Sequence, residues 1–305
     1  MLRPRVRATL PFVIAALVWT AAPAFAQAQH RSLYVTVVDA DGQPVTNLGP
    51  SDFVVREDNV QREVLTVAPA DAPMQVALLV DNSTAARNDI QNIRKGLEDF
   101  VGALAAPTDT GRRNEIALLT LGDRPTLQAD YTIDRAEIQK GIGRVFAQPG
   151  SGNYLLDAIV EAVHGIEKRT AERPVIVAIT TEGPEFSSRQ YDAVLDPLRQ
   201  SGAAFYALVI GPPSGEMTTS ARNRGIVLDQ GPRDTGGRRE TLLSSMALDG
   251  ALKTLAAQLT HALLVTYSRP ESLIPPERIT VDVKRPGLSA HGTPVKSRSG
   301  GNPEP

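Results

Sequence analysis

The sequence predicts an α/β fold: a doubly wound, mostly parallel sheet covered by helices, with a small β unit beside it. Short apolar runs alternate with helical stripes over residues 74–268, which is typical of a parallel sheet with helices on both faces. Residues 31–70 and 270–290 show strand-like alternation and no helical stripe. We therefore expect the two ends of the chain to pack together as one β unit.

The N-terminal part of the β unit opens with "SLYVTVVDADGQPV", in which apolar residues alternate with residues that face the other way. An Asp-Gly pair at 41–42 then predicts a turn. "DFVVRED" and "REVLTVAP" predict two further short strands. After residue 270, "RITVDV" again alternates apolar and polar residues, which predicts a half-exposed strand that pairs with the N-terminal unit.

The strands of the α/β domain are predicted from apolar runs. "QVALLVD", "EIALLTL", "PVIVAIT" and "AAFYALVIG" are near-continuous, as expected of strands buried on both faces. "TLQADYT" is more polar and predicts an edge strand. "ALLVTYS", at 262–268, is predicted as the last strand of this domain.

The helices are predicted from apolar residues spaced three and four apart. Clear stripes of this kind occupy residues 90–104, 156–166, 191–198 and 248–259, and a weaker one, broken by glycines, occupies 137–146. Residues 211–240 hold six glycines and three prolines and predict a long surface loop. Its arginines, including Arg222 and Arg224, are expected in a solvated mixed-charge surface or, alternatively, in a recognition loop near the top of the sheet.

The two termini carry different signals. Residues 1–26 combine three early arginines, a short apolar run and the small-residue site Ala24-Phe25-Ala26, which is typical of a secretory signal peptide. The mature protein is therefore expected to be exported, periplasmic or secreted, with no transmembrane segment once the signal is removed. Residues 291–305 are rich in Gly, Pro and Ser and predict a disordered tail.

Composition excludes several classes of function. The net charge of −2 gives no basic excess for nucleic-acid binding. The absence of cysteine excludes disulfides, thiolate metal sites and thiol nucleophiles. With 42% hydrophobic residues, the chain has enough apolar mass for a large core.

Polar side chains follow two of the predicted buried strands. Asp81, Asn82 and Ser83 come directly after the first, and Glu182 follows "PVIVAIT". Asn153 stands at the start of the helix that begins in "SGNYLLDAI". In an open parallel sheet, ligands bind beyond the carboxyl ends of the strands where the strand order reverses. If the two strands are neighbours there, these residues converge and offer oxygen atoms of the kind that Mg²⁺, Ca²⁺ or Mn²⁺ prefers.

These segments resemble von Willebrand factor type A (VWA) domains, which have a Rossmann-like fold. "VALLVDNSTA" is similar to the family's Asp-x-Ser-x-Ser segment, "SGNYLLDAI" to Gly-Gly-Thr-x-Leu-x-Asp-Ala, and "VIVAITTEGPE" to an apolar strand ending in Ser-Asp-Gly. "VVDADGQPVTNLGPSDFVVREDNVQ" and "YSRPESLIPPERITVDVKRPGL" resemble the flanks of bacterial VWFA-related proteins of the acidobacterial type. The resemblance implies a protein-binding module with a metal-ion-dependent adhesion site (MIDAS).

The motif residues depart from that pattern. Asp81 and Ser83 match it, but Ala85 replaces the second serine, Asn153 the threonine and Glu182 the aspartate. Mg²⁺ demands near-ideal geometry, whereas Ca²⁺ accepts looser coordination. We therefore expect no metal, or weakly bound Mg²⁺ or Ca²⁺, at Asp81, Ser83, Asn153 and Glu182. The alternative is that Asp81, Ser83 and Asn153 cap the helices that follow them, with Glu182 in a solvated loop.

The function expected from these observations is that of an exported, non-enzymatic module that binds another protein, of adhesion or scaffold type. Asp81, Asn82, Ser83, Asn153 and Glu182 would form its binding rim, as a degenerate MIDAS without catalytic residues. One alternative is an exported cation-dependent hydrolase that uses Asp81 and Glu182, although the sequence offers no evident general base. Another is a structural subunit of an envelope complex.

Overall fold

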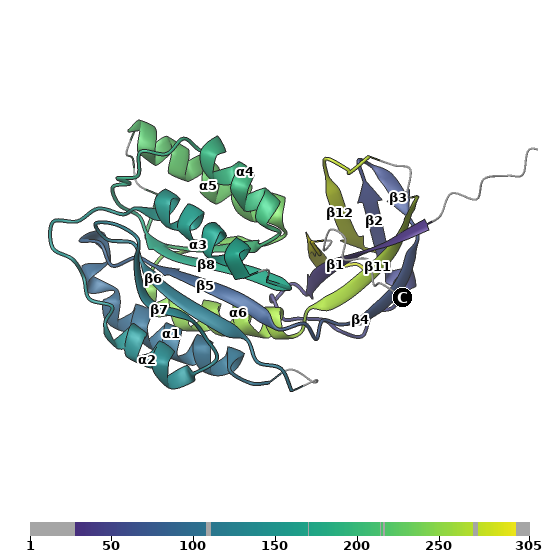
Figure 1. Cartoon of the computed structure of the whole chain (residues 1–305), viewed down its shortest axis with the longest axis horizontal. Coiled ribbons are helices and arrows are strands. Elements are labelled where there is room, and N and C mark those ends of the chain that lie inside the picture. Colours follow the sequence, from purple (N-terminus) through teal and green to yellow (C-terminus); the bar gives the residue numbers. More distant parts are fainter. Residues whose placement is uncertain are drawn as a thin grey trace, which may run out of the picture.

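The computed structural model describes residues 28–107, 111–169, 171–213, 215, 217–270 and 274–296. Its larger unit is built on a six-stranded sheet with the order β10-β9-β8-β5-β6-β7 (Figure 1). All neighbouring pairs are parallel except β6 and β7, which are antiparallel. The strands are β5 (Met74–Val80), β6 (Glu115–Thr120), β7 (Thr126–Thr132), β8 (Arg173–Thr181), β9 (Ala204–Ile210) and β10 (Arg239–Leu242).

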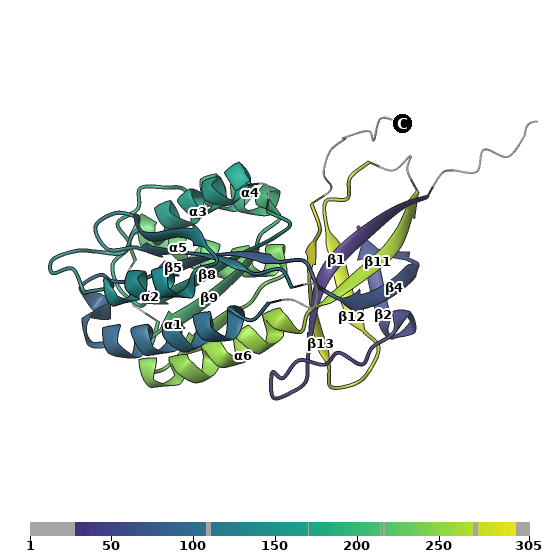
Figure 2. The ribbon, with the colours of Figure 1, turned by 60° about the horizontal axis from the view of Figure 1, so that its bottom comes forward.

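Helices cover both faces of this sheet (Figures 1 and 2). One apolar cluster joins the sheet to α1 (Ile90–Leu104), α2 (Arg135–Gly143) and α6 (Leu248–Thr260). A second cluster joins the other face to α3 (Leu155–Arg169), α4 (Asp192–Ser201) and α5 (Thr219–Thr235). Strand β5 contributes Leu78 to the first cluster and Leu79 to the second, so its continuous apolar run is buried on both sides. The predicted doubly wound α/β fold is confirmed.

The smaller unit consists of antiparallel strands from both ends of the chain (Figure 2). A four-stranded sheet has the order β13-β1-β11-β4, and a three-stranded sheet has the order β12-β2-β3. Their inward residues form one core that includes Leu33, Val55, Tyr267 and Val281. The strands are β1 (Ala28–Val38), β2 (Phe53–Glu57), β3 (Val60–Arg62), β4 (Val64–Pro69), β11 (Leu263–Pro270), β12 (Ile279–Val283) and β13 (Ser289–Pro294).

Two segments lie in different places from those predicted. The segment 262–268 was expected in the α/β sheet, but from Leu263 onward it belongs to β11, which pairs with β1 and β4 in the smaller unit. Buried and half-buried residues alternate along β11, because only one face of its sheet meets a core. Residues 291–294, expected in a disordered tail, belong to β13, whose backbone pairs with β1. Residues 297–305 of that tail lie outside the described residues.

The predicted loop at 211–240 is largely helix α5 followed by strand β10, so that prediction is wrong. Thr218 caps the helix by accepting a hydrogen bond from the Ala221 amide at 3.1 Å. Gly236 ends it in the left-handed conformation, with φ at +77°. Between these ends, Val227 and Leu228 are buried in the second apolar cluster. Burial of this face outweighs the low helix propensity of the glycines and the proline inside α5.

The segment expected to act as a signal peptide, residues 1–26, lies outside the described residues. Among the helices that the structure describes, none combines the length and the apolar character needed to cross a bilayer.

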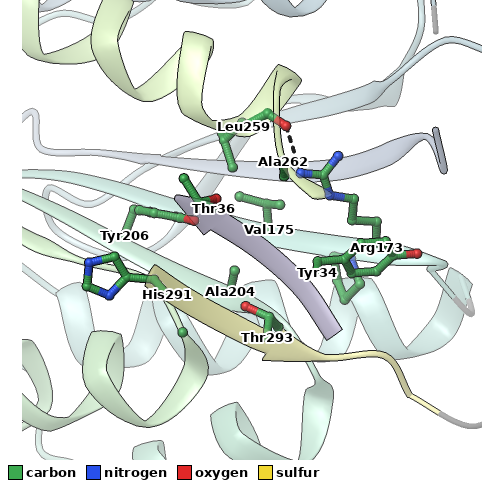
Figure 3. Close-up of a pocket in the computed structure, with 12 residues that line it drawn as sticks. Tyr34, Thr36, Arg173, Val175, Ala204, Tyr206, Leu259, Ala262, His291 and Thr293 are labelled. Carbon is green, nitrogen blue, oxygen red and sulfur yellow. Dashed lines mark hydrogen bonds between the residues drawn. The ribbon is translucent and has the colours of Figure 1, made fainter. Parts of the chain in front are cut away.

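The two units meet at the amino-terminal edge of the six-stranded sheet, where a pocket is lined by residues of both (Figure 3). The buried Arg173, at the start of β8, donates a hydrogen bond to the Leu259 carbonyl at the end of α6, at 2.7 Å. Its guanidinium also lies 5.1 Å from the ring of Tyr34 in β1. Nearby, Thr293 of β13 donates to the Thr235 carbonyl of α5 at 2.7 Å. Arg173 therefore links both units through a single buried charge.

We predict that Arg173→Met lowers the free energy of unfolding by about 2 kcal/mol, because the Leu259 carbonyl loses a charged donor. Urea denaturation measures this. Arg199→Met is the matched control: it breaks surface ion pairs with Asp196 and Asp234 and should cost less than about 1 kcal/mol. Equal effects of the two substitutions would contradict the role given to Arg173.

Candidate functional site

The carboxyl edge of the six-stranded sheet gathers the motif residues predicted from the sequence. Strands β5 and β8 are parallel neighbours, so the segments after Val80 and Thr181 emerge side by side. Asn153 lies against both: its side-chain amide is 2.7 Å from Asp81 Oδ2, and its backbone forms a bridge with Glu185. The structure thus brings together segments that are about a hundred residues apart in the chain.

Asp81 is completely buried and fully hydrogen-bonded. Its Oδ1 accepts from the Ser83 amide at 2.8 Å. Its Oδ2 accepts from Asn153 Nδ2 at 2.7 Å, from the Thr181 amide at 2.9 Å and from Thr181 Oγ1 at 2.6 Å. An ionised carboxylate has about four lone-pair sites, so four donors satisfy it. Asp81 therefore ties β5, β8 and the segment before α3 together.

Four of the five residues predicted for the binding rim are buried. These are Asp81, Asn82, Ser83 and Asn153, whereas Glu182 is half-buried. Asn82 illustrates their role: its Oδ1 accepts from the Gly122 amide at 2.7 Å, and its Nδ2 donates to the Phe146 carbonyl at 3.1 Å. A side chain at Gly122 would put its Cβ 2.8 Å from Asn82 Oδ1, which explains the glycine there. The buried residues thus hold the surrounding loops in place and are not themselves exposed to a partner.

A buried arginine completes the centre of the site. Arg224, from α5, donates from Nη1 to Glu182 Oε2 at 3.1 Å and from Nη2 to the Thr181 carbonyl at 2.9 Å. The same nitrogen lies 3.3 Å from Thr180 Oγ1, an atom that also accepts from Asn153 Nδ2 at 2.7 Å. The Arg224 side chain is 6% exposed and that of Glu182 is 10% exposed. The guanidinium therefore neutralises a carboxylate that is largely withdrawn from water.

Glu185 lies behind this ion pair. Its Oε1 accepts from the Ser187 amide at 3.2 Å, and its Oε2 is 3.9 Å from Arg224 Nε. Burial raises the pKa of Glu185 to about 7, and neither Ser187 nor Arg224 cancels the desolvation that causes this rise.

The residues at this edge do not fit a divalent cation. Asp81 already accepts four hydrogen bonds, three at Oδ2 and one at Oδ1, and Asn153 directs its amide nitrogen, a donor, toward Asp81 and Thr180. The Asn153 amide oxygen is buried and has no hydrogen-bond partner, but one amide oxygen is a poor ligand set by itself. Arg224 already places a positive charge beside Glu182, which would repel an ion there. Within the described residues, no cluster of three or more His, Cys, Asp or Glu has the arrangement of a metal site.

Several exposed apolar side chains lie in segments at the same edge of the sheet. They lie in segments that follow the carboxyl ends of the parallel strands or precede α3, and we call them the apolar rim. Its members are Phe146, Phe186, Tyr191, Met217, Leu243 and Met246. The smaller β unit lies at the opposite edge of the sheet (Figure 1), so it leaves the apolar rim uncovered.

The sequence analysis did not predict the apolar rim, and it placed Arg224 in a surface loop, either solvated or used for recognition near the top of the sheet. A helix over 219–235 was signalled by Thr218 before it, by Gly236 after it and by Val227 and Leu228 at adjoining positions of one face. Its internal glycines and proline hid that pattern. Glu185 stands three residues after Glu182, and nothing in its local sequence marks it as buried.

We predict that Glu185→Gln stabilises the protein above pH 7 but not at pH 4.5. The pKa of Glu185 is raised from 4.5 to about 7 by folding. Between pH 4.5 and pH 7, Glu185 is therefore protonated in the folded state and ionised in the unfolded state. The wild type therefore loses up to about 3 kcal/mol of its free energy of unfolding as the pH rises from 4.5 to 7. Glu185→Gln cannot ionise and avoids this loss.

Urea unfolding of both proteins at pH 4.5, 6 and 8 measures this difference. Glu161→Gln, which changes an exposed carboxylate on α3, is the control and should show no such trend. A Glu185→Gln effect that does not vary with pH would contradict the prediction.

Comparisons with known proteins agree with this geometry. Residues 76–183 match the von Willebrand factor type A domain. A search of curated proteins found no match. The fold is similar to that of proximal thread matrix protein 1 from the mussel byssus, at 17% identity and a TM-score of 0.50. A second structure of that protein, with a zinc-occupied MIDAS motif, gives 16% identity and a TM-score of 0.51.

In both cases the match covers 67% of this chain and 49% of the byssus protein, so the chain spans about half of that relative's length. At such low identity, these likenesses establish the fold alone. The family match spans the strand-end segments that carry Asp81, Asn153 and Glu182. Residues 76–183 of this chain therefore form a von Willebrand factor type A domain, as the sequence motifs predict.

Proposed function

We propose that the protein is an exported, non-enzymatic module that binds another protein through the apolar rim. The observation that carries this proposal is the grouping of six exposed, large apolar side chains on one edge of the sheet. Large apolar side chains exposed together on one side of a protein are a mark of protein–protein contact. Aromatic residues and methionine, which make up five of the six, are enriched in such interfaces.

The centre of the rim argues against catalysis. Asp81 would be the nucleophile or metal ligand of a hydrolase, but it is completely buried and accepts four hydrogen bonds. A nucleophile or general base has to reach the substrate directly or through one water. Glu182 is held by Arg224 in an ion pair. This arrangement supports a binding role over the hydrolase alternative.

Binding at the apolar rim is proposed to need no divalent cation. One similar structure, from the mussel byssus, carries zinc in its MIDAS motif. In this chain, Asp81 Oδ2, the Thr181 carbonyl and Glu182 Oε2 are engaged by protein donors, as described above. Recognition would therefore depend on apolar contact and surface shape. Export rests on the signal-like sequence of residues 1–26.

We predict that a photo-crosslinking residue at Phe186 or Met246 captures a discrete partner in cells that make the protein. Val60, on β3 of the smaller unit, is the matched control because it is an apolar residue of similar exposure: 54%, against 52% for Phe186. The adducts are read by gel shift and mass spectrometry, with and without EDTA. We expect adducts at both rim positions, and we expect them to form equally well when EDTA is present during irradiation.

Capture from Val60 to the same extent would contradict docking at the rim. Loss of the rim adducts with EDTA would contradict cation-independent binding.

A further inference from the structure

We infer that the Arg224 guanidinium is a permanent resident cation that takes the place of a divalent ion at this VWA strand edge. Its three acceptors are a hydroxyl, a backbone carbonyl and a carboxylate: Thr180 Oγ1 at 3.3 Å, the Thr181 carbonyl at 2.9 Å and Glu182 Oε2 at 3.1 Å. These are the oxygen types that bind Mg²⁺ or Ca²⁺. Here they all accept N–H groups.

The guanidinium and a metal ion exclude each other at this point. A divalent ion would have to contact the same oxygens at roughly 2.0–2.6 Å. The Arg224 nitrogens already occupy that side of them, at hydrogen-bonding distance. The guanidinium thus supplies at this point the positive charge that a metal ion would bring.

The charge balance of the centre depends on Arg224. The side chain of Glu182 is 10% exposed and that of Glu185 is fully buried, and both approach the same guanidinium. Without Arg224, two carboxylates, the Thr180 hydroxyl and the Thr181 carbonyl would lose the positive charge that Arg224 places beside them. Such a set of oxygen atoms suits a hard divalent cation.

Helix α5 is fixed so that Arg224 reaches this centre. Ser220 Oγ donates to the Ser187 carbonyl at 3.1 Å, and Asn223 Nδ2 donates to the Arg189 carbonyl at 3.1 Å. These bonds hold the helix against the segment that follows β8. Arg224 therefore enters the site from a rigid element, which favours a single position for its guanidinium.

This inference deepens the proposed function, because it gives a reason why the apolar rim would bind its partner without a metal ion. It rests on the proposed function for that link alone. Its test uses the isolated chain and no partner. A negative result here would contradict the role given to Arg224 but not docking at the apolar rim, which the crosslinking experiment tests separately.

The experiment compares the wild-type protein, Arg224→Ala and Arg224→Ala/Glu182→Gln by thermal unfolding with EDTA, Mg²⁺, Ca²⁺ or Mn²⁺. Arg222→Ala is the matched control, an exposed arginine on the same helix. The wild type and the control should not respond to any ion. Arg224→Ala should gain a rise in Tm of about 3 °C or more with saturating Mn²⁺ or Ca²⁺. The double variant should lose that rise.

Two results would overturn the inference. One is a chelator-reversible rise in the Tm of the wild type with any of these ions. The other is a folded Arg224→Ala that responds to none of them. If Arg224→Ala fails to fold, Arg224→Gln takes its place under the same criteria. Electron paramagnetic resonance of Mn²⁺ with the wild type is decisive in either case, because stoichiometric binding would contradict a resident guanidinium.

Discussion

The interaction on which the strand edge depends is the buried ion pair between Arg224 and Glu182, with Nη1 and Oε2 3.1 Å apart. An isolated charge is costly to bury, so each side chain requires the other and the hydrogen bonds around it. The pair also connects α5 to the end of β8, through the Thr181 carbonyl. Asp81 does the same for β5 and β8 with four hydrogen bonds. Together they tie β5, β8 and α5 to one another at this edge.

These internal contacts explain how the edge differs from the pattern that its sequence resembles. The side chains of the polar centre are buried and hold neighbouring segments together, whereas the large apolar side chains of the apolar rim are exposed to a partner. At the other edge, Arg173 is held within the α/β domain by the Leu259 carbonyl and contacts the β unit through the ring of Tyr34. The β unit lies at the edge of the sheet opposite the rim, as Figure 1 shows.

Much of the fold could be predicted because its signals are local. The apolar run before Asp81 and the alternation around Val281 each reflect the burial of their own strand. The convergence of Asp81, Asn153 and Glu182 followed from the rule for parallel strands. Sheet membership is not local, so β11 was placed in the wrong sheet. Arg224 was hidden because tertiary burial, and not propensity, stabilises α5, and its contacts are with residues some forty positions earlier.

The most direct test of this account is a double-mutant cycle on the free energy of unfolding, with Arg224→Met, Glu182→Gln and the double variant. Each single substitution leaves a buried group without its partner, whereas the double variant removes both charges. The account predicts a coupling energy of about 2 kcal/mol between the two positions. Additive effects, agreeing within about 0.5 kcal/mol, would show that the two charges do not depend on each other and would contradict it.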